Sequence, residues 1–127
     1  PDLDVSFAGK TILIAEDNEI NRVIVEAMLM PTKATLVFAI NGLEAIEAQK
    51  RISPGIILMD IQMPKMDGVE ACRIIKERCP AQVIIALTAN AMSDDIKLYE
   101  ESGFDGHLAK PIDLTALLNK LQQVLLD

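Results

Sequence analysis

The chain has 127 residues, half of them apolar, which suits one domain with a real hydrophobic core and excludes a disordered protein. Its net charge is −7 and it has no run of lysine or arginine, so we expect the domain not to bind DNA or RNA. No apolar run approaches the roughly 18 residues of a membrane span, and no signal peptide opens the chain. We therefore expect a cytoplasmic domain that does not itself enter a membrane. Cys72 and Cys79 lack a metal-binding spacing and are interpreted as buried thiols in a reducing cytosol.

Residues 1–9 show no periodicity, and we interpret them as a linker or leader before a single domain of residues 10–127. From residue 10 onward, five short apolar runs alternate with longer amphipathic stretches. The runs that we expect to form strands are residues 11–15, 34–38, 55–59, 82–87 and 106–109. Three of them are almost entirely apolar, which is typical of strands buried on both faces of a parallel sheet.

Helical periodicity follows the first strand and predicts a helix that ends at Pro31. The apolar residues that line one face of this helix are Ile20, Val23, Ile24, Ala27 and Met28. A second helix, headed by Leu43 and Ile46, is expected after the turn residues Asn41 and Gly42.

The starts and ends of the last three helices can also be predicted. Asp67 and Glu70 have the spacing of a capping box at the start of the third helix. Ser93 is expected to cap the fourth helix, which Gly103 would end. The fifth helix carries an apolar stripe after its cap Asp113, made of Leu114, Leu117, Leu118, Leu121 and Leu125. This fivefold strand–helix alternation predicts an α/β fold, a doubly wound three-layer sandwich with helices on both faces of a parallel sheet.

Polar residues stand where four of the five predicted strands end. Glu16 and Asp17 follow the first strand, and Asp60 follows the third. Thr88 follows the fourth strand and Lys110 the fifth. In an open α/β sheet, ligands bind outside the carboxyl ends of the strands, where the strand order reverses. With the strand order 2-1-3-4-5 that point lies between the first and third strands, so the three acids would meet there beside the hydroxyl and the lysine.

Three carboxylates in one crevice repel one another, at around 4 kcal/mol per pair at about 4 Å and an effective dielectric constant near 20. A hard divalent cation offsets this repulsion, and Mg²⁺ prefers one or two carboxylates, waters and phosphate oxygens. Carboxylates also act as nucleophiles that form aspartyl phosphates. Phosphoryl transfer needs chiefly positioning and charge neutralisation, which Mg²⁺ and Lys110 can supply. The cluster therefore favours phosphoryl chemistry at Asp60 with Mg²⁺ as the cofactor.

Each of these residues also has a purely structural interpretation when taken alone. Asp17 could cap a helix, and Asp60 could occupy a turn. Thr88 could be an ordinary strand-end hydroxyl and Lys110 a solvated charge. Their occurrence together at four strand ends favours a functional site over four separate accidents.

At these residues the sequence resembles a response-regulator receiver domain, from about residue 10 to the C-terminus. The matching motifs are ILIAEDN at 12–18, LMDIQMPKMDG at 58–68, ALTA at 86–89 and LAKPI at 108–112. The Glu-Asp-Asn run and the Asp-Ile-Gln-Met-Pro run are most similar to receivers at the C-terminus of hybrid sensor histidine kinases. The resemblance implies a five-stranded, flavodoxin-like sheet of order 2-1-3-4-5.

The resemblance also implies a metal site and a phosphoacceptor. Asp60 would accept the phosphoryl group. Asp17, Asp60 and the backbone carbonyl of Gln62 would bind Mg²⁺ directly, and Glu16 would act through water. The side chains of Gln62 and Asn90 stand where receiver residues flank the phosphoryl group and tune its lifetime.

A switch is implied by the same family pattern. Lys110 would pair with phosphoryl oxygens, aimed by a cis bond to Pro111, and Thr88 would turn its hydroxyl toward them. Receivers carry an aromatic residue three positions before this lysine that swings inward as the threonine moves. His107 holds that place here, so we expect it to take part in switching, and a solvated or buried histidine without such a role is the alternative.

The implied partners are a histidine kinase domain or a histidine phosphotransfer protein, because the phosphoryl donor would be a phosphohistidine. The protein is expected to be a monomer or a weak dimer. A signalling face is expected from the fourth helix to the fifth, where Met92, Ile96, Leu98 and Tyr99 exceed what one buried face uses, and packing in the core is the alternative for most of them. The domain would be part of a hybrid kinase, with a stand-alone response regulator as the alternative. It would not be a classical enzyme, although its parent protein could be a kinase.

Three other functions are disfavoured by particular residues. A phosphotransferase of the haloacid-dehalogenase type would have a second aspartate two positions after Asp60, where Gln62 stands. A flavodoxin-like cofactor binder would need a phosphate-cradling loop after the first strand, where Glu16 and Asp17 would repel the cofactor. A receiver used only for docking would not need all five of the site residues.

Overall fold

The computed structural model describes residues 5–89 and 92–126. Its five parallel strands form one sheet in the order β2-β1-β3-β4-β5, so the predicted fold and strand order are confirmed. The strands are β1 (Thr11–Ala15), β2 (Thr35–Ala39), β3 (Ile56–Asp60), β4 (Ile84–Thr88) and β5 (Gly106–Ala109). Three strands lie one or two residues later than predicted, which makes Asp60 and Thr88 the last residues of their strands rather than the residues that follow them.

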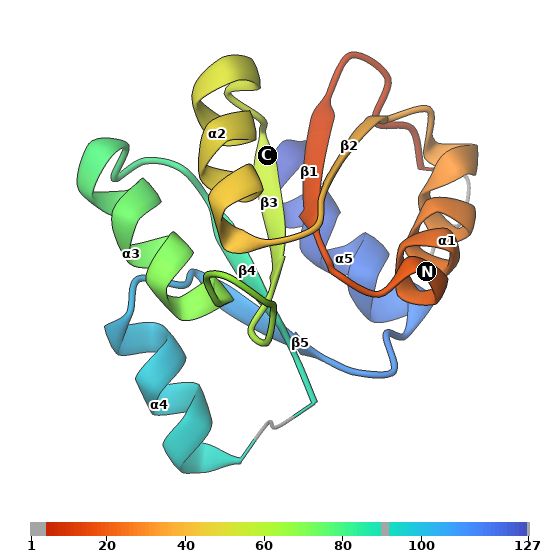
Figure 1. Ribbon diagram of the computed structural model, residues 1–127. Helices are drawn as coiled ribbons and strands as arrows, with labels where there is room; N and C mark the ends of the chain where they lie inside the picture. The colour runs from red at the N-terminus through yellow and green to blue at the C-terminus, as the bar shows by residue number, and fades with distance from the viewer. Residues whose placement is uncertain (1–4, 90–91, 127) are drawn as a thin grey trace.

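In the described part of the chain, five α-helices cover the two faces of the sheet. They are α1 (Glu19–Leu29), α2 (Gly42–Ile52), α3 (Gly68–Arg78), α4 (Ser93–Glu101) and α5 (Leu114–Leu125), with a short 3₁₀ turn at Met30–Thr32. Helices α1 and α5 lie on one face, and α2, α3 and α4 lie on the other (Figure 1). Among the described helices, none is long and apolar enough to cross a membrane.

The strand side chains alternate between two hydrophobic clusters, one on each face. In β1, Ile12 and Ile14 belong to the cluster under α1 and α5, whereas Leu13 and Ala15 belong to the cluster under α2, α3 and α4. All four are fully buried. This is the burial of a central parallel strand, and it explains why β1 and β3 read as nearly unbroken apolar runs.

Of the apolar face predicted for α1, only Met28 packs against the core. Val25 and Leu29 face the core, whereas Ile20, Val23 and Ile24 are 71%, 56% and 45% exposed. The helix has apolar residues on more than one side, so its periodicity cannot tell which of two neighbouring stripes is buried. An apolar stripe therefore lies open on the surface of α1.

The helix ends agree with the capping predictions except at α4. Asp67 and Asp113 accept backbone hydrogen bonds at the starts of α3 and α5, and Gly103, at φ +108°, ends α4. Ser93, however, lies inside α4, and Met92 is its N-cap, without a side-chain hydrogen bond. A serine beside acidic residues is a good cap in sequence terms, but the backbone enters this helix one residue earlier.

Residues near the N-terminus add to the core. Val5 and Phe7 are 8% and 0% exposed and belong to the cluster under α1 and α5. The amide of Phe7 donates to the carbonyl of Thr32 at 2.6 Å. Part of the segment that we expected to be a linker is therefore packed against the domain.

Candidate functional site

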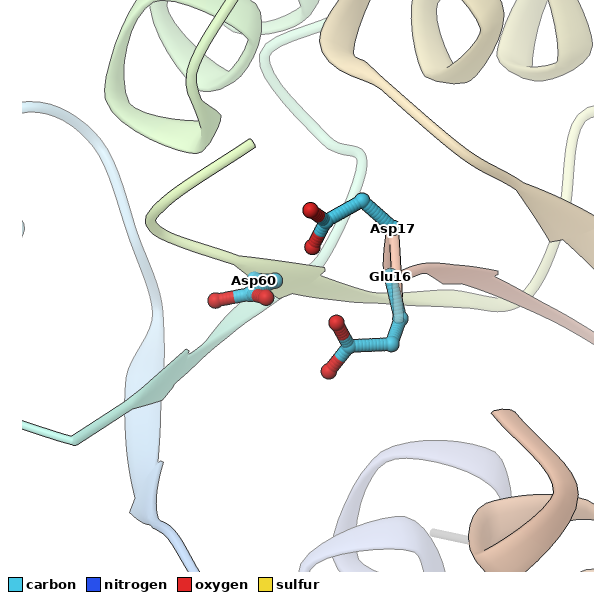
Figure 2. Close-up of side chains that lie close together, drawn as sticks. All are labelled: Glu16, Asp17 and Asp60. Carbon is cyan, nitrogen blue, oxygen red and sulfur yellow. The ribbon is translucent and has the colours of Figure 1, made fainter. Parts of the chain in front are cut away.

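Three carboxylates meet at the carboxyl edge of the sheet. Glu16 and Asp17 follow β1, and Asp60 ends the neighbouring strand β3. Carboxylate oxygens of the three side chains lie within 4.8 Å of one another, and Figure 2 shows the side chains extending into the same space. Glu16 and Asp60 are 2% and 5% exposed, whereas Asp17 is exposed. The sequence prediction that these acids converge is met by the geometry.

Backbone contacts hold the loop after β1 in place. The amide of Glu16 donates to the carbonyl of Ala39 at 2.9 Å, which continues the pairing of β1 with β2. The carboxylate of Glu16 accepts from the amide of Asn18 at 3.1 Å, and its carbonyl accepts from the guanidinium of Arg22 at 2.8 Å. Asn18 then caps α1. The turn thus fixes Glu16 inside the site and leaves Asp17 at its mouth.

Lys110 bridges the two buried acids. Its ammonium donates to Asp60 at 2.9 Å and to Glu16 at 3.0 Å, and its peptide bond to Pro111 is cis, as the resemblance implied. Burial lowers the pKa of Lys110, but the hydrogen bonds to Asp60 and Glu16 and the charges of both acids outweigh it, so the pKa lies above its ordinary value. Lys110 is therefore a fixed positive charge in the site.

The acidic excess fits a hard divalent cation. Three carboxylates against one ammonium leave about two negative charges uncompensated in a partly buried space. An all-oxygen donor set of this kind suits Mg²⁺, which binds through one or two carboxylates and keeps several waters. The amide of Gln62 donates to Asp60 at 3.2 Å, so the loop after β3 turns back onto this carboxylate.

Gly68 lets the same loop pack against the site, and sequence reasoning missed this role. Its amide donates to the carbonyl of Ile61 at 2.9 Å. A Cβ at this position would collide with the backbone carbonyl of Asp60. The Asp-Gly pair at residues 67–68 was the available signal, but the contact with Asp60 is made across the loop and has no local pattern.

A cavity of about 570 Å³ opens above these residues. Most of the predicted site residues line it, namely Glu16, Asp17, Asp60, Gln62, Thr88 and Lys110. Asn90 lies outside the described residues. His107 is half-buried and lines a different hollow, of about 360 Å³, between α4 and β5.

Tyr99 also lines the large cavity, a role that the sequence did not indicate. The sequence left open whether this residue packs in the core or lies on a signalling face, and in the structure it is 5% exposed. Its hydroxyl lies 2.9 Å from the hydroxyl of Thr88, in hydrogen-bond contact. Its ring packs edge-on against Phe104, with the centroids 6.1 Å apart. Because α4 is amphipathic, its pattern alone could not show that this ring turns inward.

A family model for the response regulator receiver domain matches residues 12–122. The chain belongs to the receiver domain family. This receiver domain is 39% identical over 122 residues to the peroxide stress-activated histidine kinase mak1 of Schizosaccharomyces pombe, a match that covers 90% of the chain and 7% of the kinase. Over 123 residues it is 35% identical to the histidine-protein kinase BarA of Escherichia coli, with 95% of the chain and 13% of BarA covered.

A shorter relative is the polar-differentiation response regulator DivK of Brucella anthropi. Identity is 31% over 120 residues, and the match covers 93% of the chain and 98% of DivK. The chain therefore spans a small part of the two kinases but nearly all of a response regulator. It is homologous both to receiver domains of hybrid histidine kinases and to separate response regulators.

Solved structures show the same fold. The receiver domain of the sensor histidine kinase PA1611 from Pseudomonas aeruginosa has a TM-score of 0.87 and 34% identity, covering 94% of this chain and all of that one. That structure holds a magnesium ion coordinated in its active site cleft. The receiver domain of Ssk1 from Saccharomyces cerevisiae, in complex with the histidine phosphotransfer protein Ypd1, has a TM-score of 0.87 and 30% identity, covering 94% and 91% of the two chains.

Proposed function

We propose that Asp60 accepts a phosphoryl group from a phosphohistidine in a Mg²⁺-dependent reaction. An oxygen of Asp60 attacks phosphorus, the nitrogen–phosphorus bond breaks, and its electron pair returns to the imidazole. The observation that carries this proposal is the buried Asp60 carboxylate, which shares one lysine with Glu16 beside a third acid. The phosphoacceptor role of the receiver family and the magnesium ion in the PA1611 receiver support it.

The residues around Asp60 are proposed to divide two tasks. Asp17, Asp60 and the carbonyl of Gln62 would hold Mg²⁺ directly, with Glu16 acting through water. When bound, Mg²⁺ neutralises charge that develops on the phosphoryl oxygens. Lys110 would bind the phosphoryl oxygens through its positively charged ammonium. The side chains of Gln62 and Asn90 are proposed to tune the phosphoryl lifetime, since receivers use these two positions for that purpose.

The test of this function is a mass measurement. The protein is mixed with Mg²⁺ and a small phosphodonor, and we expect a gain of one phosphoryl group that is absent in Asp60→Asn. Asp113→Asn is the matched control, because Asp113 caps α5, asparagine can cap as well, and Asp113 is not among the residues that line the cavity. No mass gain, or an equal gain in Asp60→Asn, would exclude Asp60 as the acceptor. The rate of phosphate release from phosphorylated Asp60 is the second readout. Slow release would indicate a receiver, whereas a phosphotransferase would release phosphate quickly and turn over many times.

We also propose that the phosphodonor protein docks against the open stripe of α1. Ile20, Val23 and Ile24 are exposed on the helix whose Asn21 lines the cavity, and Ile24 lines a small apolar hollow together with Lys110. Exposed apolar side chains next to a reactive group mark a binding site more often than a chance surface. The complex of the Ssk1 receiver with a histidine phosphotransfer protein supports a partner of that class.

If the phosphodonor protein docks on α1, a substitution there should slow transfer from that protein but not from a small phosphodonor. Val23→Asp is expected to slow transfer from a phosphorylated histidine phosphotransfer protein about tenfold or more, because it puts a charge into an apolar contact. Phosphorylation by a small phosphodonor should be unchanged, since that donor needs no docking surface. The matched control is Leu43→Asp on α2, where the side chain is 50% exposed. Equal slowing by both substitutions would contradict a docking surface on α1.

The wider setting is proposed on the same basis. Hybrid kinases among the relatives favour a receiver that forms part of a longer cytoplasmic protein, and DivK favours the stand-alone alternative. The domain itself would be a monomer or weak dimer. Met92 and Leu98, which are 71% and 45% exposed, keep the α4 side as the proposed output face.

A further inference from the structure

The hydroxyls of Thr88 and Tyr99 join the acidic cavity to helix α4. Thr88 is the last residue of β4 and is 2% exposed, and its Oγ1 lies 2.9 Å from the hydroxyl of Tyr99. Tyr99 belongs to α4, eleven residues further along the chain. A movement of the Thr88 hydroxyl would therefore change a direct contact with α4, a helix that carries exposed apolar residues.

Tyr99 borders more than one hollow. It lines the cavity that contains Asp60 and Lys110. It also lines the hollow of about 360 Å³ that His107 lines. Open space therefore lies beside Tyr99 on the His107 side, next to Phe104, against which its ring packs edge-on.

A phosphoryl group on Asp60 would compete with Tyr99 for Thr88. The residue before Thr88 is paired with Asp60 in the sheet, so Thr88 stands at the neighbouring strand end. A threonine hydroxyl has one proton to donate, and phosphoryl oxygens only accept hydrogen bonds. Thr88 must give its proton to the phosphoryl group, and turning toward Asp60 carries the hydroxyl away from Tyr99.

We propose that Tyr99, and not His107, is the aromatic residue that reads the state of Asp60. In the unphosphorylated protein its hydroxyl holds Thr88 away from the phosphoryl position. Phosphorylation draws Thr88 to Asp60, and the phenol, no longer bonded to Thr88, moves toward the hollow beside His107 and shifts α4. This inference rests on the proposed function of Asp60, and it makes Tyr99 a positioning residue that acts through Thr88.

The chain carries its own probe for this event. Tyr99 is its only tyrosine, and it has no tryptophan. The near-ultraviolet absorbance and fluorescence of the whole protein therefore report the hydrogen bonding of a single phenol. We expect both signals to change when Mg²⁺ and beryllofluoride, a phosphoryl mimic, are added to the wild-type chain. The change should be absent in Thr88→Val and should return in Thr88→Ser, which keeps the hydroxyl.

Removing the phenol hydroxyl tests the competition itself. Tyr99→Phe is expected to bind beryllofluoride about two- to tenfold more tightly in the presence of Mg²⁺, since one neutral hydrogen bond no longer opposes the turn of Thr88. In a Thr88→Val background the same substitution should change the affinity by less than twofold, because the two side chains act as one unit. Affinity is followed by ¹⁹F NMR of bound beryllofluoride, which needs no tyrosine.

The outcomes separate this inference from the proposed function. If the wild-type chain neither binds beryllofluoride nor gains a phosphoryl group at Asp60, both proposals are overturned. If it binds but the Tyr99 signals stay constant, or Tyr99→Phe binds no more tightly, only the role of Tyr99 is overturned. His107→Ala is the competing arm: loss of the Tyr99 signal change in that variant would return the switching role to His107.

Discussion

At the amino edge of the sheet two buried glutamines are hydrogen-bonded to each other and to the backbone, whereas at the carboxyl edge three carboxylates gather and one lysine bonds only two of them. The amide of Gln49 in α2 donates to the side-chain oxygen of Gln82 at 3.1 Å, and Gln82 donates to the carbonyl of Pro54 at 3.1 Å. Both glutamines are 6% exposed. The amino edge is thus polar, neutral and internally matched.

The carboxyl edge has the opposite character. Glu16 and Asp60 are as deeply buried as the glutamines, but Lys110 cannot compensate both of them and Asp17 as well. A buried polar pair that is fully matched fastens the strands and needs nothing further. A charge excess that folding leaves uncompensated suits the proposed binding of a divalent cation, which would neutralise it.

Adding Mg²⁺ should have the largest effect on this comparison. At a concentration one hundred times the dissociation constant, a ligand that binds only the folded state stabilises it by about 2.7 kcal/mol. Wild-type protein should show this gain in chemical unfolding, and Asp17→Asn should lose most of it. Glu47→Gln is the matched control, because this exposed carboxylate on α2 is not among those that line the cavity.

The order of stability of wild type and Asp17→Asn should reverse when Mg²⁺ is added. Without Mg²⁺, Asp17→Asn is expected to be slightly more stable than wild type, since it removes a charge that repels Asp60 and Glu16. With excess Mg²⁺, wild type should be the more stable of the two. If Asp17→Asn were less stable in both buffers, the acidic excess would be structural and the comparison would break.

Cutting the amide pair should have the next largest effect, at the other edge. Gln82→Ala leaves the buried amide of Gln49 without its acceptor, and we expect a loss of about 2 kcal/mol in the free energy of unfolding. Mg²⁺ affinity should not change, because the pair lies at the opposite ends of the strands. Gln123→Ala, an exposed glutamine on α5, is the control and should cost little. A weaker Mg²⁺ affinity in Gln82→Ala would show that the edges are coupled.

The sequence was sufficient for the carboxyl edge because strand ends are local features. Each site acid or base follows an apolar run, and parallel strands bring such ends together whatever the details of packing. The buried pairing of Gln49 with Gln82 links residues 33 positions apart, and no local pattern carries it. Gly68 against Asp60 is missed for the same reason.

Helix faces were predicted less well than strand ends. Periodicity on α1 placed Val23 on an apolar face, but Val25 is the valine that is buried, since the helix offers two apolar stripes to one sheet. On α4 the same ambiguity left open whether Tyr99 packs inward, and its hydrogen bond with Thr88 joins two different elements, so no local pattern carries it. The functional consequence is large, because both errors concern residues beside the site.

Cys72 extends the comparison to a buried titratable group. Its effect on the free energy of unfolding should be the smallest of those considered, and it should appear only at alkaline pH. Burial in α3 raises the pKa of this thiol from 9.0 to about 12, because the charged form is poorly solvated there. A raised pKa means that the stabilising contribution of the neutral thiol is complete below pH 9 and is lost as the pH rises toward 12. Between pH 8 and pH 10, wild-type protein should therefore lose about 1 kcal/mol more stability than Cys72→Ala.

The measurement compares unfolding free energies at the two pH values, so the constant cost of the cavity in Cys72→Ala cancels. Equal losses in the two proteins would mean that the thiol ionises in place, and that burial in the cluster under α3 does not enforce neutrality. The expected result would mean that the buried thiol of Cys72 stays neutral, as the buried amides of the glutamine pair are. Neutral groups are then the rule inside this fold, and the charged cluster around Asp60 departs from it because the proposed chemistry requires the charge.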